Sequence, residues 1–276
     1  MSPIWITGTQ GLIGSHLVRL APTAPVRALT RADLDLLDFA AVDRAFQQDR
    51  PRLVIHCAAI SVVAEAHKNP ELARRVNLDV TRHLAGLAAA IPFVFFSTDL
   101  VFDGRLGNYQ ETDAPNPLNV YGETKLAAEA AVRVNPRHLI VRTSINAGPS
   151  PNGRRAFDEQ LRQSLASAGS AMTLFNDEFR CPIAAAETAR AVWELVAKQA
   201  TGIVHVAGSE KLSRQEIGEL LLPRWSELHG RVAIKSGSAK DFPGPPRALD
   251  TSLKVAKAEH LLGRPLPRFS EWLKRS

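Results

Sequence analysis

The chain has 276 residues, of which 45% are hydrophobic and 22% are charged, and its formal net charge is +6. This composition is typical of a globular protein with enough chain for a large core in one or two domains. No apolar run approaches the roughly 20 residues that a membrane span needs, so we expect no membrane contact.

The basic residues are scattered along the chain, which argues against a nucleic-acid partner. Their densest group, residues 254–276, is interleaved with Leu261, Leu262 and Trp272, as on the wet face of a packed helix. The basic balance also suits an anionic cofactor and an anionic substrate. The start of the chain has no basic segment before an apolar stretch, and two cysteines make no disulfide framework, so we expect a cytoplasmic protein.

The first half of the chain alternates between two hydrophobic periods. Short buried strands are expected at residues 3–7, 26–30, 52–59, 92–98 and 138–144. Helices are expected at residues 11–20, 38–48, 70–90 and 120–134. Apolar strands that alternate with helices indicate a parallel sheet covered on both faces, and right-handed crossovers make it a doubly wound α/β fold.

The pattern loosens after residue 145. We expect a loop over 146–153, a helix over 154–169, a strand over 171–177 and a Pro-rich loop over 242–250. The helix at 185–199 and the strand at 202–208 are expected to return to the main sheet. The predicted division is a dinucleotide-binding Rossmann domain of residues 1–170 and 184–206, and a smaller substrate-binding domain of residues 171–183 and 207–276.

Three glycines, Gly8, Gly11 and Gly14, lie between the first strand and the first helix. In such a turn the first glycine permits a tight bend, the second lets the backbone approach a pyrophosphate, and the third lets the helix pack on the strand. The N–H groups at the helix start then face the phosphates. The predicted cradle for a dinucleotide consists of Gly8, Gln10, Gly11, Leu12, Ile13 and Gly14. The alternative is a purely structural turn.

The end of the second strand should meet the adenosine ribose, where an acidic residue favours NAD and an arginine favours the 2′-phosphate of NADP. The stretch after that strand contains Thr30 and Arg31 but no acid at the strand tip. We therefore expect NADP(H), with NAD(H) as the alternative, and Arg31 as the selecting residue, with Arg27 as its rival. Asp35 and Leu36 are expected at the adenine, while Asp38 is expected to cap the next helix.

Tyr121 and Lys125 lie four residues apart at the start of a helix, which places both side chains on one face. An ammonium group next to a phenol favours the phenolate and lowers its pKa, and such a tyrosine can exchange a proton with a carbinol oxygen. A hydroxyl at the carboxyl tip of the fourth strand, from Thr98 or its neighbour Ser97, can bind the substrate oxygen. The predicted catalytic residues are Thr98, Tyr121 and Lys125.

These motifs resemble those of the extended short-chain dehydrogenase/reductases, and within them the dTDP-4-dehydrorhamnose reductases and their relatives. The resemblance rests on "GTQGLIG", "DLDLLD", "HCAA", "FFSTDLVFDG", "YQETDAPNPLNVYGETKLAAE", "IVRTS" and "LFNDEFRCPIAAAETARA", and spans residues 3 to about 210. It implies NADPH-dependent hydride transfer to a keto group of a nucleotide-linked deoxysugar by Thr98, Tyr121 and Lys125. It also implies that Cys57, Ala58 and Ala59 line the cofactor.

The sequence departs from that family in "ISVVAEA", in "INAGPSPNG" and in "GPPRALD", three segments where the sugar or its nucleotide should bind. The substrate is therefore a nucleotide sugar or another carbonyl compound. Arg180 either grips a substrate phosphate or pairs with Asp177 or Glu178. The histidines, among them His56, His67 and His205, show no metal spacing, so no metal is expected.

Two other functions compete with the reductase. One is an NAD-dependent nucleotide-sugar epimerase or dehydratase, which would prefer an acid at the strand tip. The other is a non-catalytic, NADP-binding regulatory subunit of methionine adenosyltransferase, which the same resemblance includes. The expected partner is a small-molecule substrate, and a homodimer is possible.

Overall fold

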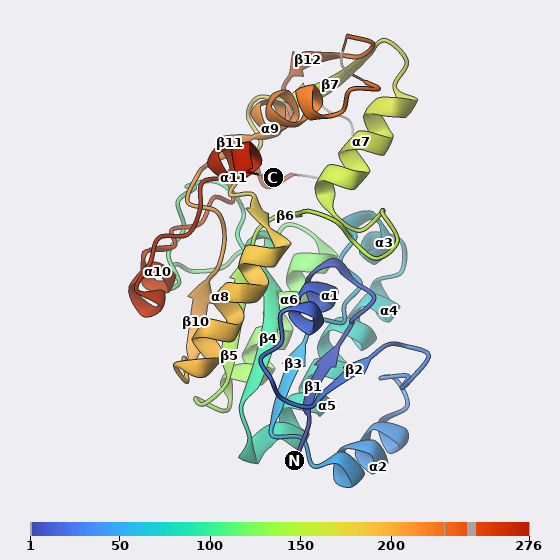
Figure 1. Ribbon diagram of the computed structural model, residues 1–276, viewed down its shortest axis with the longest axis vertical. Coiled ribbons are helices and arrows are strands. Elements are labelled where there is room, and N and C mark those ends of the chain that lie inside the picture. The colour runs from blue at the N-terminus through green and yellow to red at the C-terminus, as the bar shows by residue number, and fades with distance from the viewer. Residues whose placement is uncertain (1, 229, 242–246, 276) are drawn as a thin grey trace.

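The centre of the molecule is a parallel β-sheet of six strands, in a computed structural model that describes residues 2–228, 230–241 and 247–275 (Figure 1). Its strand order is β2-β1-β3-β4-β5-β10. The strands are β1 (Ile4–Thr7), β2 (Val26–Leu29), β3 (Leu53–His56), β4 (Phe93–Thr98), β5 (Leu139–Thr143) and β10 (Gly202–His205). The predicted α/β class with a doubly wound parallel sheet is confirmed.

The chain changes direction across the sheet at β1. On one side Thr7 is in register with Leu29 of β2, and on the other side with His56 of β3. Ligands of doubly wound folds bind beyond the carboxyl ends of the strands at such a switch point. The functional site is therefore expected where the chain leaves Thr7 and His56.

Helices cover both faces of the sheet because side chains alternate along each strand. Phe95 belongs to one buried cluster, whereas its neighbours Val94 and Phe96 belong to the other. The Phe95 face is covered by α2 (Phe39–Asp49), α5 (Val80–Leu87) and α6 (Val120–Arg133). The opposite face is covered by α1 (Leu12–Arg19), α8 (Ala185–Ala197) and α10 (Ala256–Leu262).

The helix expected over residues 70–90 is interrupted. It consists of α4 (Pro70–Arg74), a π-helical turn (Arg75–Asp79), α5 and a 3₁₀ turn (Ala88–Ala90). The side chain of Asn77, buried in the π-helical turn, bonds the backbone N–H and C=O of Ile60 and the hydroxyl of Thr124. A buried amide needs such partners, which gives a reason for the irregular turn. The helix α3 (Val63–Lys68) was not predicted.

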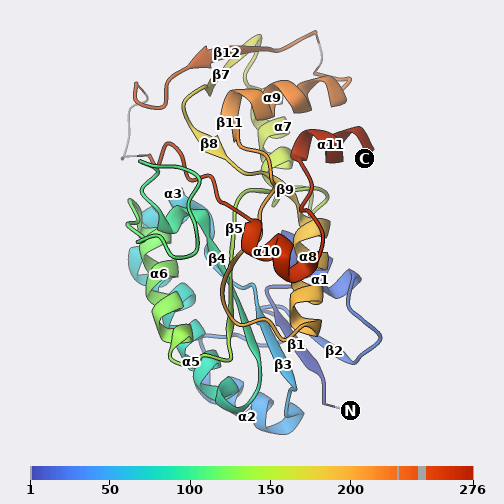
Figure 2. The same ribbon diagram turned by 90° about the vertical axis from the view of Figure 1, so that its left-hand side faces the viewer.

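A second region lies beyond the carboxyl ends of the main strands (Figure 1). It contains the parallel pair β7 (Ala171–Phe175) and β12 (Ala233–Gly237), the antiparallel pair β8 (Phe179–Arg180) and β11 (Leu212–Ser213), α9 (Arg214–Leu221) and α11 (Phe269–Arg275). The parallel pair β6 (Asn146–Ala147) and β9 (Ile183–Ala184) joins the two regions. Helix α10 packs on β10 and α8 at the main sheet, and Figure 2 shows it beside α8.

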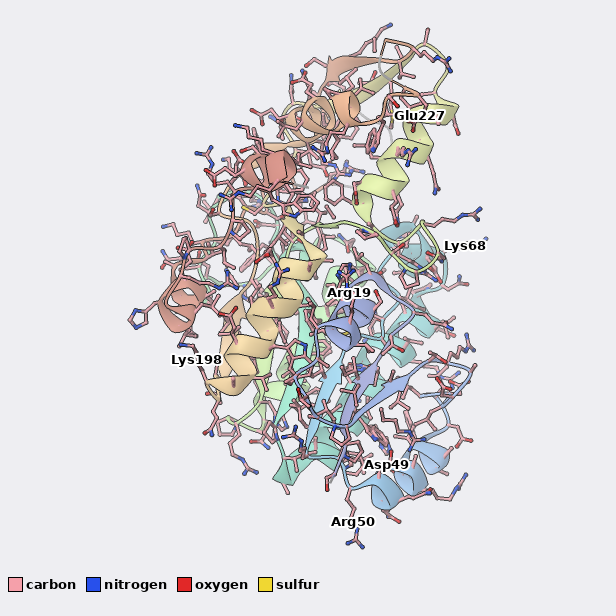
Figure 3. All side chains as sticks on the ribbon, viewed as in Figure 1. Arg19, Asp49, Arg50, Lys68, Lys198 and Glu227 are labelled. Carbon is pink, nitrogen blue, oxygen red and sulfur yellow. The ribbon has the colours of Figure 1, made fainter. Side chains whose placement is uncertain are left out.

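Helix α7 (Phe157–Ser167) packs in the second region. Leu165 clusters with Leu228 and Val232, and Arg162 pairs with Glu227, which lies beside α7 in Figure 3. We therefore propose to draw the boundary of the predicted substrate-binding domain before α7 rather than at residue 170. Of the Pro-rich loop expected over 242–250, residues 242–246 lie outside the described residues.

Candidate active site

The glycine turn after β1 has the form that a dinucleotide phosphate requires. Gly8 has a φ of +69°, and a Cβ at Gly8 would lie 2.7 Å from the backbone nitrogen of Ala58. A Cβ at Gly14 would lie 2.9 Å from the carbonyl carbon of Gly8. Larger residues would therefore force the helix and the β3 loop away from the turn.

The start of α1 leaves its N–H groups to a ligand. Gly11 is the N-cap and, within the described residues, neither a capping side chain nor an acidic residue satisfies the first turn. Gln10 is exposed, Leu12 packs on Ala156 and Ala185, and Ile13 packs on the core. The side chains of Leu12 and Ile13 are therefore turned into the protein, so any contact of these two residues with a phosphate would be made by their backbone N–H groups.

The loop after β3 is fixed against the same turn. The hydroxyl oxygen of Thr7 accepts hydrogen bonds from the N–H groups of Cys57 and Ala58, over 3.2 and 3.3 Å. Cys57 and Ala58 therefore border the glycine turn, and Ala59 follows them in the chain; that the three line the cofactor stays a prediction. Burial raises the pKa of the Cys57 thiol, which keeps it protonated as a small apolar group.

The tip of β2 differs from the expectation in one respect, because a carboxylate does stand there. The chain turns back after Thr30, and Asp33 accepts hydrogen bonds from the N–H and the hydroxyl of Thr30 over 2.9 and 2.6 Å. The side chain of Arg31 is 82% exposed and lies 3.9 Å from Asp35. The sequence reasoning missed Asp33 because the acid reaches the strand tip only through this turn.

Arg27, the rival of Arg31, is engaged elsewhere. Its guanidinium pairs with Asp49 and lies 5.6 Å from the centre of the Trp5 ring. Asp49 is at the amino-terminal end of the sheet, away from the second region (Figure 3). Asp38 caps α2 by accepting the N–H of Ala41, as expected, and the side chain of Leu36 packs against the core.

The two candidate hydroxyls at the tip of β4, those of Ser97 and Thr98, have different partners. Ser97 points to the α6 side and donates to Glu129 over 2.5 Å. Thr98 ends the strand, donates to Asp99 over 3.1 Å and lowers the pKa of the Tyr121 phenol. Thr98, and not Ser97, is therefore in place to contact a substrate oxygen.

Tyr121 and Lys125 occupy the first two turns of α6. Asn119 caps the helix by accepting the N–H of Gly122 over 2.9 Å, and Gly122 allows α6 to pack closely on the segment after β4. Lys125 is only 3% exposed, and its Nζ lies 4.0 Å from the centre of the Phe95 ring. The local sequence thus presents both residues towards the carboxyl end of β4.

The expected lowering of the Tyr121 pKa does not occur in this structure. Burial raises the pKa of Tyr121 to about 12; the hydrogen bond with Thr98 offsets part of the rise, and the Asp99 carboxylate adds to it. Lys125 does not counter this rise, because it lies against Phe95 and its own pKa is lowered to about 7, so it carries no charge at the pH where the phenol ionises. Tyr121 is therefore a protonated phenol at neutral pH, which is the form of an acid that donates a proton.

Burial also lowers the pKa of Lys125 to about 7, while Cys57 and Glu129 act in the opposite direction. A lysine that titrates near neutrality changes its charge readily when an anionic ligand arrives. Its neighbour His56 is buried and held by Thr7, and its pKa is lowered to about 3, so it is neutral.

Asp99 is a central residue of the site that the sequence did not reveal. It is 3% exposed, accepts hydrogen bonds from Thr98, Ser144 and Thr251, and lies 3.8 Å from Arg180. Apart from its neighbour Thr98, its partners come from three distant parts of the chain. Only the motif "FFSTD" hinted at an acid after the catalytic hydroxyl.

Arg180 is a bridge between two buried carboxylates. Its Nη2 lies 3.1 Å from Glu178, its Nε faces Asp99, and its Nη1 donates to the carbonyls of Phe179 and Leu249. Of its two predicted roles, pairing with Glu178 is the one that the structure shows, because these contacts occupy the guanidinium. The other predicted partner, Asp177, bonds Ser238 and Ala239.

Two further arginines surround Glu178. The Nε of Arg247 lies 2.6 Å from Glu178, and the Nε of Arg214 lies 3.9 Å from it. Their side chains are 40% and 31% exposed. Three guanidinium groups thus face two carboxylates, Glu178 and Asp99, which leaves an excess of positive charge close to Thr98.

Two of the segments that depart from the family pattern are tied to this site: Ile60 bonds Asn77, which bonds Thr124 of α6, and Asn146 bonds the carbonyl of Ser144, a partner of Asp99. Residues 60–62 lie between β3 and α3, and Val62 is exposed. Asn146 is buried and is hydrogen-bonded to Thr143 and Thr188. In the last segment, Gly244–Pro246 lie outside the described residues. Within the described part of the chain, no group of His, Cys, Asp and Glu side chains is arranged to hold a metal ion. No helix in that part has the length and apolar character needed to cross a membrane.

The whole chain, residues 1–276, matches the family described as the RmlD substrate binding domain. A dTDP-4-dehydrorhamnose reductase of Sinorhizobium fredii is 31% identical over 98% of this chain and 95% of its own length. The methionine adenosyltransferase 2 subunit beta of Xenopus laevis is 30% identical over 77% of this chain and 69% of its own. The structure of dTDP-4-dehydrorhamnose reductase from Bacillus anthracis in complex with NADP superposes with a TM-score of 0.88, at 26% identity, over 99% of this chain and 98% of that one.

Proposed function

We propose a function that follows from family membership, because this chain belongs to the RmlD substrate binding domain family. It is an NADPH-dependent reductase of the extended short-chain dehydrogenase/reductase type that acts on a keto group of a nucleotide-linked sugar. One observation carries the chemistry: Tyr121 and Lys125 lie one turn apart on α6, the Lys125 ammonium lies against Phe95 of β4, and the same strand ends in Thr98.

The residues around the switch point fit a dinucleotide. Gly8, Gly11 and Gly14 leave space for its phosphates, and the N–H groups at the start of α1 supply hydrogen-bond donors to them. Arg31 is free to reach a 2′-phosphate, and Cys57, Ala58 and Ala59 border the cradle. When bound, NADPH supplies the hydride; Lys125 is proposed to hold the nicotinamide ribose.

Tyr121 is proposed to donate the proton that the carbonyl oxygen needs when the ketone becomes an alcohol. Its raised pKa keeps the phenol protonated, and Asp99 keeps Thr98 oriented. Thr98 is proposed to turn its one hydroxyl hydrogen from Asp99 to the substrate oxygen, so that the carbonyl is placed next to the phenol. General-acid groups of this kind contribute roughly 10²–10⁴-fold to a rate.

Arg214 and Arg247 are proposed to meet the anionic part of the substrate. Both are partly exposed, whereas Arg180 behind them is buried between Glu178 and Asp99. An excess of positive charge near a reaction centre favours a substrate that carries phosphate, such as a nucleoside diphosphate sugar.

The similarity to the methionine adenosyltransferase subunit supports a second candidate, a regulatory protein that binds NADP while a partner carries out the chemistry. The intact set of Thr98, Tyr121 and Lys125 favours the enzyme. A homodimer and a cytoplasmic location are proposed together with the reductase; both cysteines are free, as suits a reducing compartment.

A panel of 4-keto nucleotide sugars, incubated with the purified protein and NADPH, tests this function through the loss of NADPH absorbance. The reductase predicts oxidation of NADPH and formation of the matching alcohol with at least one carrier nucleotide. A protein that binds NADPH but reduces no member of the panel, and that captures an adenosyltransferase from its host, would support the regulatory candidate instead.

A further inference from the structure

A buried ion pair lies directly behind the proposed active site. Glu129, on the third turn of α6, accepts two hydrogen bonds from Arg142 of β5, over 2.9 and 2.7 Å. Both side chains are 1% exposed. Ser97 of β4 donates a third hydrogen bond to Glu129, over 2.5 Å. The strand register brings Ser97 and Arg142 side by side on the face that α6 covers.

The stability of the fold does not explain this arrangement well. The desolvation of a buried ion pair offsets most of its attraction, and apolar residues of similar volume are often as stabilising. The guanidinium also lies 5.0 Å from the centre of the Phe102 ring, and its Nη1 has no hydrogen-bond partner among the described residues. These features suggest that the charges serve a purpose other than packing.

The residues next to this ion pair are those of the proposed active site. Tyr121, Lys125 and Glu129 follow one another at intervals of one helical turn on α6. Ser97 precedes Thr98 on β4. Glu129 is thus the carboxylate one turn away from the Lys125 ammonium.

Lys125 nevertheless has no ion pair with Glu129 within 4 Å in the described part of the chain; its Nζ lies over Phe95 instead. Both oxygens of Glu129 are engaged by Arg142, and one of them also by Ser97. Two other titratable groups interact with Lys125: the Cys57 thiol raises the pKa of Lys125, and Lys125 lowers the pKa of the His56 imidazole. Both groups are uncharged at neutral pH. The phenol of Tyr121, one turn before it, is also uncharged.

We propose that Glu129 and Arg142 form a positioning pair for Lys125: Arg142 balances the charge of Glu129, so that Lys125 is not drawn into an internal salt bridge and stays available for a ligand. This inference rests on the proposed function only for the identity of that ligand. The pair does not touch the substrate or the reacting atoms.

The proposal predicts that the two single variants shift the pKa of Lys125 in opposite directions. In Arg142→Met, the carboxylate of Glu129 loses its partner, so the apparent pKa of Lys125 should rise by about one unit or more. In Glu129→Gln, the guanidinium of Arg142 is left unbalanced and the pKa should fall. Arg142→Lys keeps the charge and serves as the matched control, with a pKa close to that of the wild type. A merely structural role would lower stability in the variants without an opposed shift.

The test measures the titration of Lys125 in the folded protein by the pH dependence of the NMR signal of its side chain, with circular dichroism as the check of folding, because a side chain that is 3% exposed is closed to an amine reagent. Opposite shifts in the two variants support the proposal, and an unchanged titration in both overturns it. If either variant does not fold, Ser97→Ala, which removes one hydrogen bond from Glu129, should still raise the pKa slightly; no shift there also overturns it. Failure of the proposed function alone would appear differently, as opposite shifts in proteins that do not oxidise NADPH.

Discussion

The carboxylate of Asp33 accepts hydrogen bonds from both the backbone N–H and the side-chain hydroxyl of Thr30, which places an acid at the tip of β2. The hydroxyl of Thr30 lowers the pKa of Asp33, so the acid is charged at neutral pH. The 2′-phosphate of NADPH would therefore meet Asp33 as well as Arg31. Selectivity between NADPH and NADH depends on the balance between these two side chains.

Arg31→Ala should weaken NADPH binding by about tenfold and leave NADH almost unchanged, because a charge-assisted contact of a largely exposed side chain is at the low end of about 1.5–3 kcal/mol. Asp33→Asn should strengthen NADPH, since it removes a repulsion. Titration of both nucleotides measures these effects. Arg27→Ala is the matched control, because its guanidinium is paired with Asp49 and should not alter the NADPH-to-NADH ratio. Equal losses of both nucleotides in Arg31→Ala would contradict the assignment.

Lys125→Met should stabilise the protein at pH 7. The folded-state pKa of Lys125 is lowered to about 7, so the unfolded chain binds more protons between pH 7 and the ordinary lysine value. The stability of the wild type therefore rises as the pH rises from 7 towards 10. Met at this position has no charge to bury, so at pH 7 it removes a penalty of a few kcal/mol, because each unit of pKa shift corresponds to about 1.4 kcal/mol. Urea unfolding at pH 7 and pH 9 should show a larger gain at pH 7. An equal or larger gain in stability at pH 9 would contradict the lowered pKa of Lys125 in the folded protein.

Asp99→Asn should lower the pKa of Tyr121, because the Asp99 carboxylate contributes to its rise. The alkaline limb of the pH profile of kcat should move to lower pH. Ser144→Ala serves as the control, because it removes one hydrogen bond to Asp99 but keeps the charge. If the limb moves equally in both variants, the cause is a local rearrangement and not the charge.

Arg214→Gln should raise the KM for the nucleotide sugar by about tenfold with little change in kcat, since it removes binding that is uniform along the reaction. The NADPH affinity should not change. Arg162→Gln is a matched control, because Arg162 is an exposed arginine paired with Glu227 on α7. An unchanged KM in Arg214→Gln would place the anionic group of the substrate elsewhere.

The sequence predicted the parts of the fold that depend on local pattern. The glycine spacing, the apolar strands and the one-turn interval between Tyr121 and Lys125 are visible without tertiary information, and the structure contains the corresponding sheet, turn and helix. The capping role of Asp38 was equally visible.

The sequence did not predict the features that depend on distant partners. The hydrogen bonds of Asp99 to Ser144 and Thr251 join residues 45 and 152 positions apart. The raised pKa of Tyr121 was missed because the spacing says nothing about where the Lys125 ammonium points once it is buried on Phe95. The short strands β8 and β11, of two residues each, carry no periodicity to detect.

The most direct test compares wild type with Tyr121→Phe in NADPH oxidation by a 4-keto nucleotide sugar that the wild type reduces, together with the NADPH affinity of both. The substitution removes one hydroxyl and keeps the shape of the side chain. We predict a fall in turnover of roughly 100-fold or more with almost unchanged NADPH affinity, because only the proton donor is lost. Near-normal turnover in Tyr121→Phe would contradict the assignment of Tyr121 as the acid of this reductase.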